Sequence, residues 1–294
     1  MAEGGEGPSL PTPFKKMLVK ALRGEVPDEL LPLLPSGFQI IGDVAILSLR
    51  PKVEEYVGLI AEFILENFKY IRTVCLKLGP IVGPEKRPQV KIVAGRPSTI
   101  TVHKEAGCLF KLDVAELMFA KGNINERARM ARVVREGELV LDMFAGIGYF
   151  SIPMAKTGKP DLIYAVDINP TAVHYLAENI RLNKVRGLVV PVLADCRQVA
   201  DRLPDLADRV VMGYLPGTAD FLPYALKALR PEGGVIHYHD IYHECELWWK
   251  PIRALEEAGL RVGYRLTGIT HKRIVKSYGP RLYHVVIDAL FEPA

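Results

Sequence analysis

Apolar and polar positions change their spacing near the middle of the chain. Up to about residue 115, short apolar runs alternate with turn residues. One helical stretch, Val53–Phe68, carries apolar residues every three or four positions. Two alternating runs, Thr99–His103 and Cys108–Asp113, flank a Gly-containing turn and predict a hairpin. We therefore expect a small mixed α+β domain over residues 14–115, preceded by a Gly- and Pro-rich flexible tail over residues 1–13.

Beyond residue 137, strand-like apolar runs alternate with helical ones, which predicts a mostly parallel sheet with helices on both faces. The expected strands are 139–141, 162–166, 188–193, 209–212 and 235–238, and the expected helices are 149–157, 170–183, 219–229 and 245–258. The last run, Leu282–Phe291, follows no crossover helix and is expected to pair antiparallel at one edge. This α/β domain should cover residues 138–294, after a linker region over 116–137 that carries a helix.

Composition excludes several classes of protein. With 294 residues, 49% hydrophobic and 24% charged, the chain is an ordinary globular protein of about two domains. There is no signal peptide at the start and no apolar run of the ~20 residues that a membrane span needs. The four Cys form no CxxC pair and have no zinc-finger spacing, so we expect reduced thiols in the cytoplasm and no structural metal.

The net charge of +4 is unevenly distributed. Between Lys69 and Arg96 seven basic residues face a single acid, Glu85, and between Arg261 and Arg281 six basic residues face none. Such segments are either solvated faces or surfaces that follow a phosphate backbone.

The first strand of the second region ends in an acid and a Gly-rich turn. The sequence is Leu-Asp142-Met-Phe-Ala-Gly146-Ile-Gly148-Tyr-Phe-Ser151, the order strand, turn, helix that brings a ligand against backbone N–H groups. Ser151 stands where a dinucleotide fingerprint has its third glycine, and Asp142 would repel a pyrophosphate. These two departures favour a cationic ligand without phosphate, such as S-adenosylmethionine, over NAD.

Two further acids follow the next two predicted strands. Asp167 should accept hydrogen bonds from a ribose diol, and Asp195 with Cys196 should hold an adenine ring. Each acid could instead cap the following helix, an explanation that is adequate for one of them but not for all three.

With these motifs in place, the chain resembles the class I methyltransferase-type enzymes that modify tRNA at position 37. The resemblance rests on residues 139–151, on Val166–Pro170 and on the segment Glu178–Asn183, and it extends over most of residues 30–290. It implies a class I, Rossmann-like catalytic domain that uses S-adenosylmethionine, with tRNA as the partner. Two branches share this plan: tRNA guanine-37 N1-methyltransferases, and wybutosine-pathway enzymes that transfer a 3-amino-3-carboxypropyl group to C7 of 4-demethylwyosine.

The segment after the fourth strand favours the second branch. The methyltransferases carry an Asn-Leu-Pro or Asn-Pro-Pro motif there, and its Asn holds the guanine. Here Gly213 stands at that position in Met-Gly-Tyr-Leu-Pro. Glycine would leave room for a bulkier tricyclic base, against which Tyr214 could stack. The blander interpretation is that Gly213 only permits close packing.

The resemblance also implies site residues. The expected cofactor-binding residues are Arg127, Asp142, Phe144, Ala145, Gly146, Gly148, Asp167, Asp195, Cys196 and Gly213. Arg127 is in addition the candidate for a catalytic role, although with Arg129, Arg132 and Arg135 it could belong to a solvated helix face. The expected substrate or tRNA contacts are Tyr149, Tyr214, Pro216, Lys272, Arg273 and Lys276.

Three further hypotheses concern a metal site, the absence of catalysis and the oligomeric state. His237, His239 and His243 recur at short spacing, which raises a metal site as a minor alternative. The chain could also be an RNA-binding module with an inactive cofactor fold, but its intact strand-end acids argue against this. Finally, we expect the enzyme to act as a monomer.

Overall fold

A computed structural model describes residues 12–83, 85–119 and 121–294. By their contacts these residues form two units. Unit 1 holds the described residues of Met1–His103 and Leu112–Phe119, and unit 2 holds those of Lys104–Lys111 and Ala120–Ala294. The domain bounds predicted from sequence remain a prediction. The tip of the hairpin, residues 104–111, groups with unit 2.

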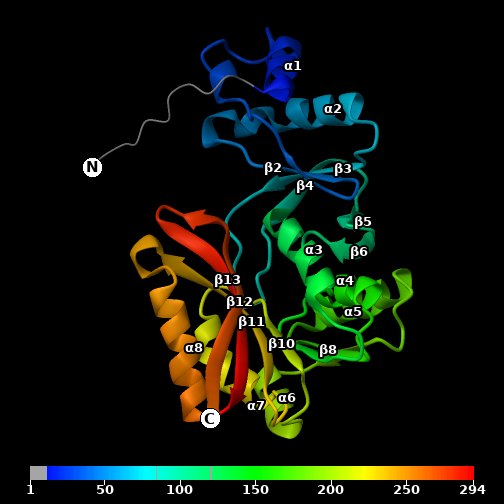
Figure 1. The fold of residues 1–294 in the computed structure, drawn as a ribbon. Coiled ribbons are helices and arrows are strands. Elements are labelled where there is room, and N and C mark those ends of the chain that lie inside the picture. The colour runs from blue at the N-terminus through cyan, green and yellow to red at the C-terminus, as the bar shows by residue number, and fades with distance from the viewer. Residues whose placement is uncertain (1–11, 84, 120) are drawn as a thin grey trace. The chain divides into compact units, whose positions relative to one another are not determined.

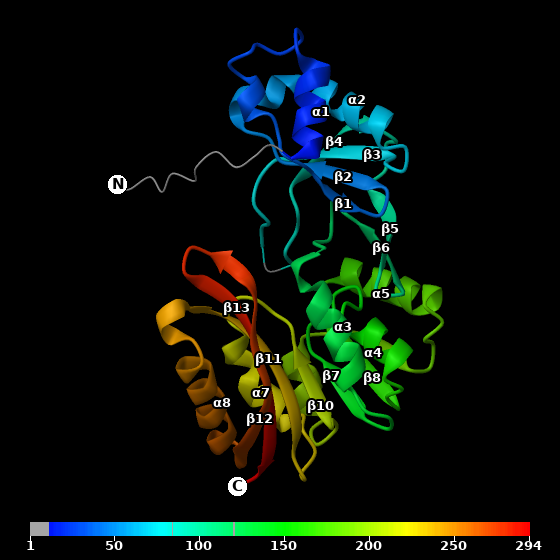
Figure 2. The same ribbon diagram turned by 45° about the horizontal axis from the view of Figure 1, so that its top comes forward.

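Unit 1 is built on a four-stranded sheet of order β1-β2-β3-β4, with α1 and α2 against it (Figure 2). Its main elements are α1 (Pro13–Leu22), β1 (Gln39–Ile41), β2 (Val44–Leu47), α2 (Val57–Asn67), β3 (Thr73–Lys77) and β4 (Val90–Gly95). Short 3-10 helices cover Leu31–Leu33 and Pro51–Tyr56. Helix α1 has a favourable N-terminus, because the Thr12 hydroxyl accepts from the Lys15 amide at 3.2 Å and a proline occupies the first helical position.

A two-stranded sheet of β5 (Ile100–Glu105) and β6 (Cys108–Asp113) forms the predicted hairpin. The chain continues into α3 (Ile124–Val133) and then into the elements of the large sheet (Figure 1). These are β7 (Leu139–Asp142), α4 (Ser151–Thr157), β8 (Leu162–Asp167), α5 (Pro170–Leu182), β9 (Val189–Leu193), α6 (Cys196–Arg202), β10 (Arg209–Met212), α7 (Leu222–Lys227), β11 (Gly234–His243), α8 (Trp249–Arg261), β12 (Tyr264–Gly279) and β13 (Leu282–Pro293).

The large sheet of unit 2 has seven strands in the order β12-β13-β11-β10-β7-β8-β9. Strands β11, β10, β7, β8 and β9 are parallel, while β13 pairs antiparallel with β11 and with β12. Helices α6, α7 and α8 bury apolar residues against one face, and α3, α4 and α5 cover the other (Figure 1). This is the class I α/β architecture with an antiparallel edge that the sequence predicts.

Several local expectations need correction. The sequence pattern did not predict β4, α6 or the long edge strand β12. Strand β13 is antiparallel as predicted, but it lies inside the sheet, because β12 pairs along its outer side. Of the tail predicted over residues 1–13, residues 1–11 lie outside the described residues, while Pro13 already belongs to α1. Strand β12 escaped notice because four register shifts against β13 break its alternation of polar and apolar positions.

Candidate active site at the carboxyl ends of the parallel strands

The Gly-rich turn between β7 and α4 is anchored to both neighbouring strands. The Met143 amide donates to the Val211 carbonyl at 3.0 Å, and the Ala145 amide donates to the Val166 carbonyl at 2.8 Å. Gly148 has φ 95°, and a Cβ there would come within 2.5 Å of the Ile152 side chain. A larger residue would therefore be both strained and crowded, so this glycine is required by the backbone.

Asp142 is a fully buried carboxylate at the end of β7. Its Oδ2 accepts from the Ser151 hydroxyl at 2.6 Å, while its Oδ1 is buried without a hydrogen-bond partner. Burial raises the pKa of Asp142 to about 7; the Ser151 hydroxyl and the backbone of Phe144 and Ser151 act to lower this pKa, and the charge of Asp167 acts to raise it. An unpartnered buried acceptor at a strand end suits a cationic group of a ligand.

Asp167, the last residue of β8, contacts the same Gly-rich turn. One of its oxygens accepts from the Gly146 amide at 2.8 Å and the other from the Asn169 amide at 2.9 Å. Asn169, not Asp167, caps α5, because its side chain accepts from the Thr171 amide. Asp167 therefore does not cap α5; in this structure its carboxylate holds the Gly-rich turn and the start of the loop before α5.

Asp195 behaves differently from the other two acids. It is the N-cap of α6, accepting from the Arg197 amide at 2.9 Å, and it pairs with the Arg197 guanidinium at 2.5 Å. The capping alternative is thus correct for this residue. Its neighbour Cys196 is buried, and burial raises the pKa of the thiol to about 12, so Cys196 is a neutral packing residue.

An aromatic cluster lies next to the turn. The rings of Phe144 and Tyr214 stack with centroids 5.2 Å apart, and Phe221 packs edge-on against Phe144 at 5.0 Å. Two predicted site residues, Phe144 and Tyr214, are thus brought together from the segments after β7 and after β10. Pro216, two residues beyond Tyr214, is exposed.

The space beside Gly213 is not empty. A Cβ at this position would meet the ring of Phe150 at 3.0 Å. This contact supports the packing interpretation of Gly213. Its expected role in leaving room for a bulky base stays a prediction. An Asn at position 213 would require that ring to move.

The basic face of α3 divides into an inward and an outward half. Arg127 is 2% exposed, and Arg129 pairs with Asp288 and Glu126 inside the fold. Arg132 on α3 and Arg135, two residues beyond its end, are exposed. The Arg127 guanidinium forms two hydrogen bonds with Glu105, of 2.6 and 2.7 Å, and lies 5.8 Å from the centroid of the Tyr149 ring. Arg127 is accordingly not part of a solvated helix face.

The histidines of β11 are engaged with protein groups. His237 Nδ1 lies 2.6 Å from Asp288 and Nε2 lies 2.5 Å from Arg209 Nη1, so both ring nitrogens have partners. His239 Nδ1 lies 3.0 Å from His284 Nε2, and burial lowers the pKa of both rings to about 3. Among the described residues, no group of three or more His, Cys, Asp or Glu side chains is placed to hold a metal ion.

Comparison with known proteins identifies the family of this fold and site. The model of the TRM5/TYW2 methyltransferase domain matches residues 101–267, and that of the TYW2 N-terminal domain matches residues 18–99. The chain belongs to the TRM5/TYW2 family.

Three relatives illustrate the range of this family. A tRNA(Phe) (4-demethylwyosine(37)-C(7)) aminocarboxypropyltransferase of Methanocaldococcus jannaschii is 46% identical over 87% of this chain and 98% of its own length. The tRNA (guanine(37)-N(1))-methyltransferase Trm5b of Pyrococcus abyssi is 38% identical over 90% of this chain and 77% of its own. The crystal structure of Pyrococcus horikoshii TYW2 in complex with MeSAdo matches with a TM-score of 0.84 and 36% identity, over 95% of this chain and all of that one.

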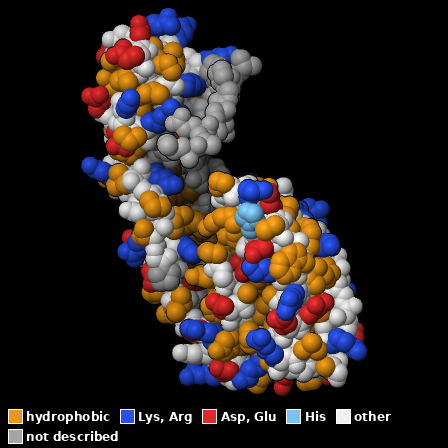
Figure 3. Space-filling view, turned by 90° about the vertical axis from the view of Figure 1, so that its left-hand side faces the viewer, with side chains coloured by type: hydrophobic (Ala, Val, Ile, Leu, Met, Phe, Trp, Pro, Cys, Tyr) orange, Lys and Arg blue, Asp and Glu red, His pale blue; other side chains and the backbone are white. Residues whose placement is uncertain are grey.

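The three basic residues that were predicted to contact tRNA all lie on β12 of this TRM5/TYW2 protein, but their surroundings differ. Lys272 is exposed, with its Nζ 5.5 Å from the centroid of the Trp248 ring, and Arg273 is partly exposed. Lys276 is partly buried and lies against Gly122, and burial together with the charge of Arg127 lowers its pKa. Lys276 therefore lies on the Arg127 side of the unit, apart from Lys272. On the face in Figure 3, Lys and Arg are interspersed with Asp and Glu.

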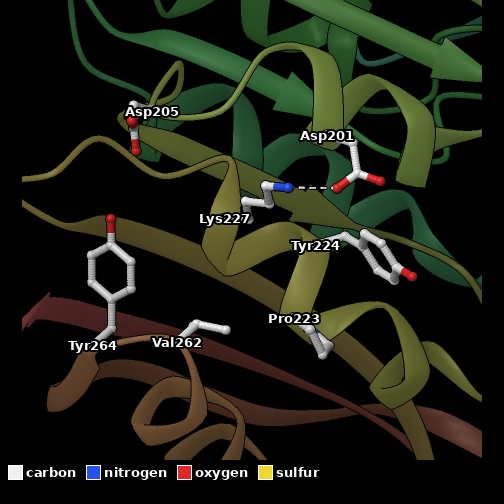
Figure 4. A pocket seen from close by; sticks show the side chains of 7 residues that line it. All are labelled: Asp201, Asp205, Pro223, Tyr224, Lys227, Val262 and Tyr264. Carbon is white, nitrogen blue, oxygen red and sulfur yellow. Dashed lines mark hydrogen bonds and ion pairs between the residues drawn. The ribbon is translucent and has the colours of Figure 1, made fainter.

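A separate pocket of about 440 Å³ lies between α6, α7 and the start of β12 (Figure 4). It is lined by Asp201, Asp205, Pro223, Tyr224, Lys227, Val262 and Tyr264. Tyr264 begins β12, and its hydroxyl donates to the carbonyls of Leu229 and Arg230, just before β11 begins. The pocket therefore lies at the amino end of β11, away from the acids at the carboxyl ends of the parallel strands. Lys227 pairs with Asp201 across it at 2.7 Å, and none of the predicted site residues lines it.

Sequence reasoning missed two residues that the site depends on. Ser151 was noted only as a departure from the dinucleotide fingerprint, yet it donates to Asp142. Glu105 lies in the predicted hairpin, 22 positions before Arg127, and no local pattern indicated their pairing.

The raised pKa of Asp142 predicts a pH-dependent stability. Between pH 4 and 7 the folded protein keeps a proton on Asp142 that the unfolded chain has lost, so stability falls as pH rises through this window. Asp142→Asn removes this loss. Its stability relative to the unsubstituted protein should be about 2–3 kcal/mol more favourable at pH 8 than at pH 5, measured by urea unfolding. The exposed Asp161, changed to Asn, is the control. Equal differences at both pH values would contradict the assignment.

Proposed function

We propose that the protein transfers the 3-amino-3-carboxypropyl group of S-adenosylmethionine to C7 of 4-demethylwyosine at position 37 of tRNA(Phe), with release of methylthioadenosine. The observation that carries this is the 46% identity to an aminocarboxypropyltransferase, which this chain covers over 98% of that enzyme's length. Met212-Gly213-Tyr214 agrees with it, because the side chain with which the methyltransferase branch holds guanine is absent.

The strand-end residues fit S-adenosylmethionine. The buried, unpartnered oxygen of Asp142 can receive the amino group of the methionine part, and the turn at Gly146 and Gly148 lets a ligand approach the backbone closely. Asp167 retains acceptor sites for a ribose diol, since each carboxylate oxygen has two lone pairs. Asp195 and Cys196 follow β9, where an adenine ring would lie. The Asp195 carboxylate also pairs with the Arg197 guanidinium.

The chemistry supplied by the donor is a sulfonium that activates the adjacent γ-carbon of its methionine part. The bond from the base carbon to that γ-carbon forms as the γ-carbon–sulfur bond breaks, the electron pair stays on sulfur, and the displaced ring proton goes to solvent. The protein's contribution is positioning. The turn and Asp142 hold the amino acid part, Arg127 faces the reacting groups, and the Phe144–Tyr214 stack offers an aromatic surface for the base.

The tRNA partner is supported at the level of the family, since a Trm5 relative was solved in complex with tRNALeu. Binding of tRNA(Phe) at its anticodon loop, action as a monomer and localisation in the cytoplasm belong to the proposal. Within the described residues, no helix is long and apolar enough to span a membrane.

The specific runner-up is tRNA guanine-37 N1-methylation, because Trm5b of Pyrococcus abyssi is 38% identical over most of this chain. An RNA-binding module without catalysis is disfavoured by the intact Asp142 and Asp167. The nucleoside released from S-adenosylmethionine separates these possibilities.

We expect methylthioadenosine as the main product when the protein is incubated with S-adenosylmethionine and tRNA(Phe) bearing 4-demethylwyosine. Chromatography of the released nucleoside, with mass spectrometry of the tRNA, measures this directly. Adenosylhomocysteine together with a methyl mass gain would establish the runner-up instead, and turnover of neither kind would favour the binding module.

Asp167→Ala should weaken binding of S-adenosylmethionine by about 1–3 kcal/mol, because charge-assisted hydrogen bonds to the ribose would be missing. Calorimetry measures the affinity. Because Asp167 also accepts from Gly146, Asp167→Asn is the milder companion variant that keeps the shape of the turn. Unchanged affinity in both variants would refute the ribose assignment.

Lys272→Ala combined with Arg273→Ala should weaken tRNA binding and reduce its salt dependence, by about one counterion for each phosphate that the variant no longer neutralises. The matched control is Lys227→Ala, which removes a basic residue of α7 that pairs with Asp201. Filter binding over a series of salt concentrations gives both quantities. If the double variant and the control bind alike, this part of β12 does not contact tRNA.

A further inference from the structure

The tip of the β5–β6 hairpin is fastened to α5 by two asparagines. Asn183 accepts from the Leu109 amide at 2.8 Å and donates to the Leu109 carbonyl at 2.7 Å. Asn179 does the same with Lys111, at 2.7 and 3.1 Å. The four residues from Asn179 to Asn183 advance about 6 Å along a helix, close to the advance of two residues in a strand, so the two side chains pair with alternate peptides of β6.

Asn179 also connects this hairpin to the Gly-rich turn. Its amide donates to the Ile147 carbonyl at 3.1 Å, while Lys156 from α4 donates to the Gly107 carbonyl at 2.6 Å. The hairpin tip is therefore built into the catalytic unit beside the turn that would hold the cofactor.

Glu105, at the end of β5, brings a buried carboxylate to Arg127. The pair is 6% and 2% exposed, and both carboxylate oxygens accept, one from Nε at 2.6 Å and the other from Nη2 at 2.7 Å. A two-point contact of this kind fixes the plane of the guanidinium as well as its position. The contact continues to the site, because Arg127 lies over the Tyr149 ring and a Cβ on Gly146 would meet that ring at 2.7 Å.

We propose that Glu105 is a positioning residue for the transfer reaction, which holds the Arg127 guanidinium in one orientation toward the reacting groups. This inference rests on the proposed function, in which Arg127 faces the reacting groups. Stability alone is a weak reason for such a pair, since a buried ion pair rarely stabilises more than apolar residues of similar size. Orientation of a guanidinium is something that an apolar pair cannot supply.

The test compares Glu105→Gln, Arg127→Lys and the double variant in steady-state kinetics with S-adenosylmethionine and tRNA. Glu105→Gln should lower kcat about 10- to 100-fold, the size expected when a catalytic group is misplaced by about 1 Å, while the KM values for both substrates change less than about threefold. In the Arg127→Lys background the same change should lower kcat less than about twofold, because Glu105 acts through Arg127.

The matched control is Lys111→Gln, which removes a different ion pair of the same hairpin, that of Lys111 with Glu178. Rates are normalised to the folded protein, counted by cofactor-binding stoichiometry. If Glu105→Gln does not fold, Glu105→Asp keeps the charge but withdraws the carboxylate by one methylene, and its kcat should fall about tenfold.

Two results would overturn the proposal: a kcat for the Glu105 variant equal to that of Lys111→Gln, or reductions in kcat that multiply in the double variant. Rates are counted as S-adenosylmethionine consumed, whichever nucleoside is released. The proposed function is judged separately from the product of the unsubstituted enzyme, so failure of one conclusion is distinguishable from failure of the other.

Discussion

Charged side chains buried between α3 and its neighbours are the constraint on which the catalytic unit depends. A charge removed from water must meet a partner of opposite sign or it destabilises the fold. Arg127 meets Glu105 from β5, and Arg129 meets Asp288 from β13. The linker helix is thereby tied at once to a hairpin that precedes it and to a strand near the end of the chain.

The same ionic contacts continue through the sheet. Asp288 binds His237, whose other nitrogen faces Arg209, and Arg209 pairs with Glu138 at 2.7 Å. Burial raises the pKa of Asp288, but hydrogen bonds from His237 and Arg129 outweigh it, and the pKa lies below its ordinary value. For His237, burial lowers the pKa of the ring and so favours its neutral form, because burial disfavours the charged form of any group. Of the three histidines that suggested a metal site, His237 is thus a link in this network, whereas His239 lies against His284 and His243 against Cys245.

The candidate site follows from the parallel part of the sheet. Strands β10, β7, β8 and β9 are neighbours, so their carboxyl ends bring Asp142, Asp167 and the segment from Gly213 to one edge. The glycines let the backbone turn there, and the buried Asp142 adds an acceptor without a partner. In the proposed function, recognition of a cationic amino acid group and of a ribose would rest on this edge, while the hairpin supplies the Glu105 carboxylate that contacts Arg127.

The sequence by itself determined most of the alternation of strands and helices in the second unit, the Gly-rich turn and the acids at the strand ends, because hydrophobic periodicity and turn chemistry are local. It also indicated the family through residues 139–151 and Glu178–Asn183. It did not indicate β4, α6 or β12. It did not determine the partners of Arg127 or of Asn179, the position of β12 at the sheet edge, or the ring of Phe150 beside Gly213. Those features join residues far apart along the chain, and their pairing is decided only when burial forces each polar group to find a partner and each side chain to fill the space left by another.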